Sequence, residues 1–212
     1  MNTEMERYLK PTPAIDCDHL ALEQKTRELT RGQEDAVQKA KSLFYFVRDE
    51  IKYNMHTPIF RLEDFKASTT LSRGEGYCVQ KAVLLAALSR AAGIPAGLGF
   101  ATLRNNLLPE ETLQWLGTNI LPFHGYAELY LNGKWVKATP AFDIALCEKN
   151  RIIPVEFDGV NDAVFHSHNR DGKLHMEYLE DLGRHLDDLP LDRLWETLIE
   201  TYGKRRLNPT GR

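Results

Sequence analysis

A glycine-bearing turn that delivers one cysteine to an apolar helix constrains this chain more than any other feature. The turn is Gly-Glu-Gly-Tyr at 74–77, and Cys78 follows it directly. Residues 79–92 are mostly leucine, alanine and valine, and the stretch stops at Gly93-Ile94-Pro95. Glycine suits the position just after a helix, and Pro95 cannot continue one. A helix that is apolar on all sides is normally buried, so Cys78 is expected at the first turn of a core helix.

Two interpretations of Cys78 follow from that position. The unpaired N–H groups and the macrodipole at a helix N-terminus favour negative charge, which lowers the pKa of a thiol and makes it a nucleophile. Free cysteine is also among the most buried residue types, so a structural role in the core explains Cys78 equally well. The turn alone does not separate these interpretations.

A β-hairpin with a histidine at its start favours the nucleophile. The segments 124–131 and 134–139 read as strands joined by Asn132-Gly133, the strongest short hairpin signal. His124 opens the first strand. Imidazole is the side chain best suited to take a proton from a thiol, and it needs a further group to orient its second nitrogen.

Other elements are expected on both sides of this core. Helices are predicted from about Asp16 or Asp18 to Leu29, over about 34–50, and for about a dozen residues from Leu191. A strand is predicted at 96–103, and short strands at 152–157 and 163–166. The segment 104–122 reads as an irregular loop of the kind that is often functional, and residues from Lys204 onward as a frayed tail.

Composition excludes several classes of partner. The 212 residues suffice for one generous domain, and the net charge of −3 provides no basic field for nucleic acid or an anionic membrane. No apolar run approaches the ~20 residues that span a bilayer, and the first ten residues lack a signal-peptide core. Cys17, Cys78 and Cys147 are far apart and odd in number, which fits a reducing cytoplasm better than a disulfide framework. We therefore expect a cytoplasmic protein with no nucleic-acid or membrane partner, in an oligomeric state that the sequence leaves open.

Together these motifs resemble the transglutaminase-like superfamily of papain-type cysteine enzymes. The resemblance is carried by GEGYCVQKAVLLAALSRAAGIPAG and FHGYAELYLNGKWVKATPAFD. It implies an α+β fold in which the helix bearing the nucleophile packs on an antiparallel β-sheet. Residues 1–212 would form a single domain, with a core at about 33–143, a helical lead-in at 1–32, and a loop-rich extension at 144–212 that ends in a helix.

The resemblance also assigns roles to individual residues. Cys78 matches the family nucleophile and His124 the family base. The aspartate that the family places directly before a proline falls on Thr139. Asp143 is the nearest carboxylate and is the favoured orienter of His124, with Thr139 as the alternative. Gly125 stands where the family more often has alanine.

The implied function is thioester-forming acyl transfer or hydrolysis at a carboxamide or peptide bond, with a peptide, protein or amide as substrate and no cofactor. Hydrolysis by a cysteine protease or amidase is favoured over transamidation. The alternative is a binding or assembly module that kept the fold and lost efficient chemistry, because Thr139 replaces the usual carboxylate. An arylamine acyltransferase-like role is a weaker alternative. His166 and His168 could hold a metal on one strand face, but solvated histidines are the favoured interpretation, so no metal site is predicted.

Overall fold

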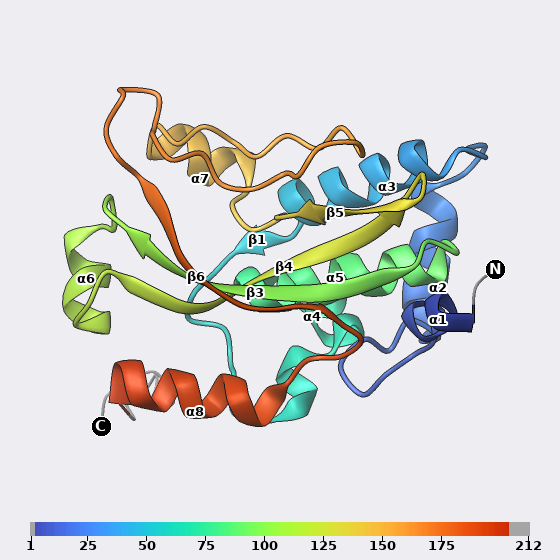
Figure 1. The fold of residues 1–212 in the computed structure, drawn as a ribbon, viewed down its shortest axis with the longest axis horizontal. Coiled ribbons are helices and arrows are strands. Elements are labelled where there is room, and N and C mark those ends of the chain that lie inside the picture. The colour runs from blue at the N-terminus through green and yellow to red at the C-terminus, as the bar shows by residue number, and fades with distance from the viewer. Residues whose placement is uncertain (1–2, 204–212) are drawn as a thin grey trace.

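A four-stranded antiparallel sheet with helices packed on it forms the core of the computed structural model, which describes residues 3–203 (Figure 1). The strand order is β5-β4-β3-β6. The strands are β3 (Ala96–Asn105), β4 (Ile120–Leu131), β5 (Lys134–Ala138) and β6 (Met176–Leu186). The α+β fold, the hairpin and the central strand are as predicted, and the tail predicted from Lys204 lies outside the described residues.

The helix α5 (Cys78–Ala91) packs along β4 and is covered by helices on its other sides, so every residue from Val79 to Arg90 is buried. These neighbouring helices are α2 (Leu20–Leu29), α3 (Ala36–Tyr45) and α4 (Ala67–Arg73). This full enclosure explains why the α5 sequence is apolar on all sides, as predicted.

A short parallel ribbon leads into α5. Gly74 ends α4 in the left-handed conformation with φ 70°, which glycine adopts without steric cost. The chain then forms β2 (Glu75–Gly76), which pairs with β1 (Lys52–Tyr53). The turn predicted before the cysteine is therefore held on both sides, and it places Tyr53 next to the start of α5.

The remaining elements complete the layers around the core. They are α1 (Thr3–Glu6), η1 (Arg7–Leu9), the π-helical η2 (Phe46–Glu50), η3 (Leu62–Phe65), α6 (Glu110–Leu116), α7 (Ile144–Lys149) and α8 (Leu191–Tyr202). The predicted helix at 34–50 is α3 continued by η2, and the predicted C-terminal helix is α8. No helix in the part of the chain that the structure describes is both long and apolar enough to cross a bilayer.

Two strand predictions in the extension fail. Residues 152–157 form no strand, and at 163–166 only Ala163 makes a bridge, to Ala138. Instead β6 adds to the free edge of β3, although its residues are largely exposed and include several charged side chains. An exposed edge strand lacks the apolar alternation that marks a strand in sequence, so β6 carries no sequence signal that separates it from a loop.

Candidate active site

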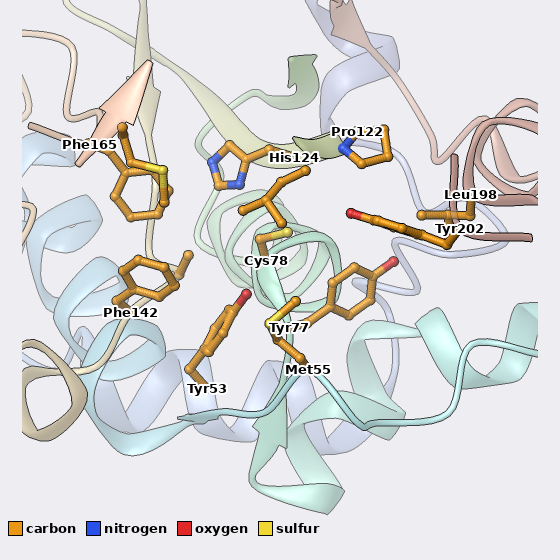
Figure 2. Close-up of a pocket in the computed structure, with 13 residues that line it drawn as sticks. Tyr53, Met55, Tyr77, Cys78, Pro122, His124, Phe142, Phe165, Leu198 and Tyr202 are labelled. Atoms are coloured by element: carbon orange, nitrogen blue, oxygen red, sulfur yellow. The ribbon is translucent and has the colours of Figure 1, made fainter. Parts of the chain in front are cut away.

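Cys78 and His124, the predicted nucleophile and base, line the same small pocket (Figure 2). Its volume is about 40 Å³, room for about one water-sized group beside the reacting atoms. Aromatic and aliphatic side chains form most of the remaining wall, including Tyr53, Phe142 and Phe165. Figure 2 shows the hydroxyl groups of Tyr53 and Tyr202 directed towards the centre of this pocket.

The side chain of Gln80 fixes the backbone that carries Cys78. Its Oε1 accepts hydrogen bonds from the N–H of Tyr77 at 3.1 Å and from Thr57 Oγ1 at 2.6 Å. Its Nε2 donates to the carbonyl oxygens of Pro58 and Asp64, at 2.9 and 2.8 Å. A glutamine three residues into a helix that reaches back to the capping residue is a known helix-start signature. Sequence reasoning missed Gln80, although this spacing could have identified it.

Gly125 allows β4 to approach the start of α5. A Cβ atom added to Gly125 would lie 2.9 Å from Val79 Cα and 3.2 Å from Val79 Cγ2. Because Val79 follows Cys78 and Gly125 follows His124, this close approach brings Cys78 and His124 to one pocket. Most of the family has alanine at this position, but here the backbone of Val79 leaves no room for a Cβ atom, so the site requires glycine.

A β-bulge directs His124. Ala101 of β3 pairs with His124 and Leu103 pairs with Leu121, so β4 contains one extra residue at this point. Phe123 lies within the bulge with φ 57°, a conformation that costs a bulky residue about 1–3 kcal/mol. Bulges commonly re-aim a side chain next to an active site, and here the bulged segment immediately precedes His124.

His124 is buried in an uncharged environment. Its exposed fraction is 3%, and its ring packs on Phe165 with 5.0 Å between ring centroids. Within residues 3–203 its buried Nε2 atom has no hydrogen-bond partner. Loss of solvation lowers the pKa of His124 to about 3. The resting imidazole is therefore neutral at pH 7.

Neither predicted orienter hydrogen-bonds to His124 in the part of the chain described. The carboxylate of Asp143 accepts from the N–H of Tyr53 at 2.9 Å and from that of Leu146 at 2.8 Å, and it caps α7. Strand alternation places Thr139 on the sheet face that carries His124, and its buried hydroxyl lies beside the hydroxyl of Tyr178. Neither residue lines the pocket, so the identity of the third group remains a prediction.

A buried lysine, Lys81, lies one helical turn after Cys78. Lys81 is fully buried, and its Nζ donates to the carbonyl oxygens of Arg48 and Ile51, at 3.0 and 2.5 Å. Burial lowers its pKa to about 7, while Asp143 and Asp49 act in the opposite direction. Lys81 thereby links α5 to the end of η2. Asp143 caps α7 and also favours the charged form of Lys81.

The histidines of the extension do not gather at one site. His166 and His168 are exposed, whereas His175 is buried and desolvation lowers its pKa to about 4. Residues 3–203 contain no group of three or more His, Cys, Asp or Glu side chains that could hold a metal ion.

Comparison with known proteins identifies the family. Among solved structures, a candidate cysteine protease from Cytophaga hutchinsonii has a similar fold, with a TM-score of 0.53 and 16% identity over 87% of this chain. A candidate protease from Parabacteroides distasonis is 15% identical over 60% of this chain, with a TM-score of 0.40. The chain spans only 58% and 26% of those two proteins, and a search of curated proteins gave no significant match. The sequence model of the transglutaminase-like superfamily matches residues 23–140, so the chain belongs to that superfamily.

Proposed function

We propose that this protein is a cysteine-dependent amide hydrolase that works through a thioester on Cys78. The observation that carries this proposal is the common pocket of Cys78 and His124, built by a helix start and a bulged strand. Cys78 Sγ attacks the carbonyl carbon of the amide, and its proton passes to His124. The C–N bond breaks, and the amine leaves with that proton. Water then adds to the thioester, releases the acid and restores the thiol.

The surroundings of His124 favour a neutral imidazole over an imidazolium ion at rest. Burial disfavours imidazolium, and the low pKa of His124 has no contribution from a carboxylate. Proton transfer from Cys78 to His124 therefore accompanies attack on the substrate, and charge develops only once the carbonyl is in place.

Two groups can stabilise the oxyanion that forms. The first N–H groups of α5 have no acceptor within the helix, and they favour negative charge at its N-terminus. The Tyr53 hydroxyl, directed into the pocket, is a further donor (Figure 2). Tyr53 is held by the bond from its N–H to Asp143 and by edge-to-face packing on Phe142, with 4.8 Å between centroids.

Acylation by p-nitrophenyl acetate tests this function, with release of nitrophenolate followed by absorbance and the acyl-protein by intact mass. Cys78→Ser should abolish the thioester, and His124→Gln should slow acylation about 10²–10⁴-fold through loss of the base. Cys17→Ala is the matched control, because this buried thiol contacts the carbonyl of Leu9, does not line the pocket, and should leave the rate unchanged. Acylation of Cys78 at the same rate in His124→Gln would rule out His124 as the base.

The acyl acceptor is tested in the same reaction. Adding a primary amine such as glycine ethyl ester divides the thioester between acid and amide products. Hydrolysis predicts that the acid dominates at millimolar amine, whereas a transamidating enzyme would form mainly the amide. We also propose a cytoplasmic location, which suits a catalytic thiol.

A binding or assembly module is the second candidate. It is favoured by the lack of a hydrogen bond from His124 to any carboxylate among residues 3–203. A module predicts that Cys78 reacts with the ester no faster than a small free thiol under the same conditions. An enzyme predicts a rate at least about a hundredfold higher.

A further inference from the structure

A second, larger pocket adjoins the one that contains Cys78. Its volume is about 230 Å³, which exceeds the ~150 Å³ cavity that accommodates benzene in a protein core. The two pockets share the wall residues Tyr53, Met55, Leu121 and Phe142. In Figure 2, the three of these that are labelled lie together on one side of Cys78. A group attached to the Cys78 sulfur that passes these shared residues would reach the second pocket.

The wall of this second pocket is largely apolar. It contains no aspartate, glutamate, lysine or arginine, and its aliphatic part includes Leu107, Leu108, Leu146 and Ile152. These residues come from the segment 105–112, which precedes and enters α6, and from α7 and the turn after it. The segment that the sequence predicted as an irregular loop thus provides one side of a binding pocket.

The three asparagine side chains in the wall are used by the protein itself, and the ring of His56 packs on Trp115 with 4.5 Å between ring centroids. Asn105 Oδ1 accepts from the N–H of Leu107 at 2.9 Å, and Asn150 Nδ2 donates to the carbonyl of Leu146 at 2.9 Å. Asn54 Oδ1 accepts from the N–H of His56 at 2.8 Å, and its Nδ2 donates to Glu75 at 3.1 Å. These contacts leave shape and apolar area as the main sources of selectivity. The wall offers a charged occupant no carboxylate, ammonium or guanidinium group, so such an occupant would lose its hydration without a permanently charged partner.

We propose that this pocket binds an aromatic or branched aliphatic group on the acyl side of the scissile amide. The inference rests on the proposed function, because it takes Cys78 as the atom that becomes acylated. The acyl side is assigned because this part of the substrate stays bonded to sulfur in the thioester, and the shared wall begins beside that sulfur. The substrate class is thus an amide or peptide whose carbonyl carries a bulky apolar substituent, and a short polar or anionic acyl group is excluded.

Acyl esters that share one leaving group test the pocket directly. The p-nitrophenyl esters of acetate, 3-phenylpropanoate and succinate carry a small, an aromatic and an anionic acyl group. Each second-order rate constant for acylation of Cys78 is divided by that of the same ester with N-acetylcysteine, which removes intrinsic reactivity. The phenylpropanoyl ester should be preferred over acetyl roughly tenfold or more, and succinyl should be the slowest.

Two substitutions in the pocket wall should remove this preference. Leu108→Asp introduces a charge, and Thr112→Trp fills the volume, and neither residue lines the Cys78 pocket. Acylation by the small acetyl ester should change less than about twofold in either variant. Leu20→Asp, at a leucine that is 62% exposed on α2, is the matched control and should retain the preference.

The outcomes separate the two proposals. If no ester acylates Cys78 faster than free thiol, the proposed function fails. If Cys78 is acylated rapidly but the normalised constants of the acetyl and phenylpropanoyl esters are equal in the unsubstituted protein, the acyl pocket fails. A preference that survives both Leu108→Asp and Thr112→Trp in folded protein would also overturn it, because the aromatic group would then bind elsewhere. The comparison of the acetyl and phenylpropanoyl esters in the unsubstituted protein tests the acyl pocket even if a variant does not fold.

Discussion

Replacing Gly125 by alanine should separate Cys78 from His124, the proposed catalytic pair, while leaving both side chains intact. The added Cβ would lie 2.9 Å from Val79 Cα, and ordinary contact begins near 3.4 Å. The obstacle is backbone, which cannot rotate away as a flexible side chain could. Strand β4 and the start of α5 must therefore move apart by about half an ångström.

Two magnitudes follow from this displacement. Forcing an extra carbon into a packed core costs about 1–3 kcal/mol of folding free energy. A misplacement of about 1 Å in a catalytic group can cost a hundredfold in rate, so about half that displacement should cost roughly tenfold. Total stabilities of about 5–15 kcal/mol leave most molecules of such a variant folded.

Gly97→Ala is the comparison that isolates the catalytic effect. Its Cβ would lie 3.1 Å from the carbonyl oxygen of Leu186, so it crowds β6 instead of α5. Urea unfolding gives the stability of each variant, and p-nitrophenyl acetate gives the rate of Cys78 acylation per folded molecule. Both variants should lose stability, and only Gly125→Ala should lose about tenfold in rate. Equal rates in the two variants would refute the argument that Gly125 sets the distance between β4 and α5.

Three further substitutions or titrations test the electrostatics. Because His124 and His175 have folded pKa values of about 3 and 4, below the ordinary 6.5, the unfolded chain binds more protons between those values and 6.5. Stability measured by urea unfolding should therefore fall as pH drops from 6.5 towards 4, less steeply in His175→Phe; an unchanged slope would contradict the burial of a neutral imidazole. Burial lowers the pKa of Lys81 to about 7 from 10.5, so the free energy of unfolding should rise between pH 7 and 10.5 by up to about 5 kcal/mol relative to Lys81→Met; parallel pH curves for the two proteins would exclude this lowered pKa. Thr139→Asp should raise the pKa of His124, seen by NMR titration of the ring, because a nearby carboxylate favours imidazolium; no shift would show that position 139 does not face the base.

Local signals were sufficient to predict the two elements that carry Cys78 and His124. The helix carrying Cys78 ends in Gly-Ile-Pro, and the hairpin carrying His124 turns at Asn-Gly, so both elements are specified by adjacent residues. The strand β6 could not be predicted in the same way, because it is defined by pairing with β3 and not by its own pattern. The left-handed Phe123 is likewise invisible in sequence, because the register of β4 against β3 forces it.

The third catalytic group was ambiguous in sequence because spacing does not give the direction of a loop. Asp143 precedes α7, and an aspartate before a helix is a common capping residue. The structure uses it in that way, and its second oxygen holds Tyr53 at the pocket wall. Asp143 therefore acts on the site by holding Tyr53 and by raising the pKa of Lys81. The predicted hydrogen bond from Asp143 to His124 is not among the observed contacts.

In the proposed mechanism, the charge that stabilises imidazolium comes from the bound substrate and not from a carboxylate of the protein. A base acts best when its pKa lies near the working pH, and His124 in its apolar enclosure lies well below that. Imidazolium can form only beside a negative charge, and within the pocket that charge arises on the substrate oxygen as sulfur attacks. An acyl group that fills the adjoining apolar pocket would hold the carbonyl against Cys78 and exclude water, which strengthens the attraction between oxyanion and imidazolium. Binding energy from the acyl pocket should therefore increase the acylation rate constant itself and not only the affinity, because it is realised when both charges are present.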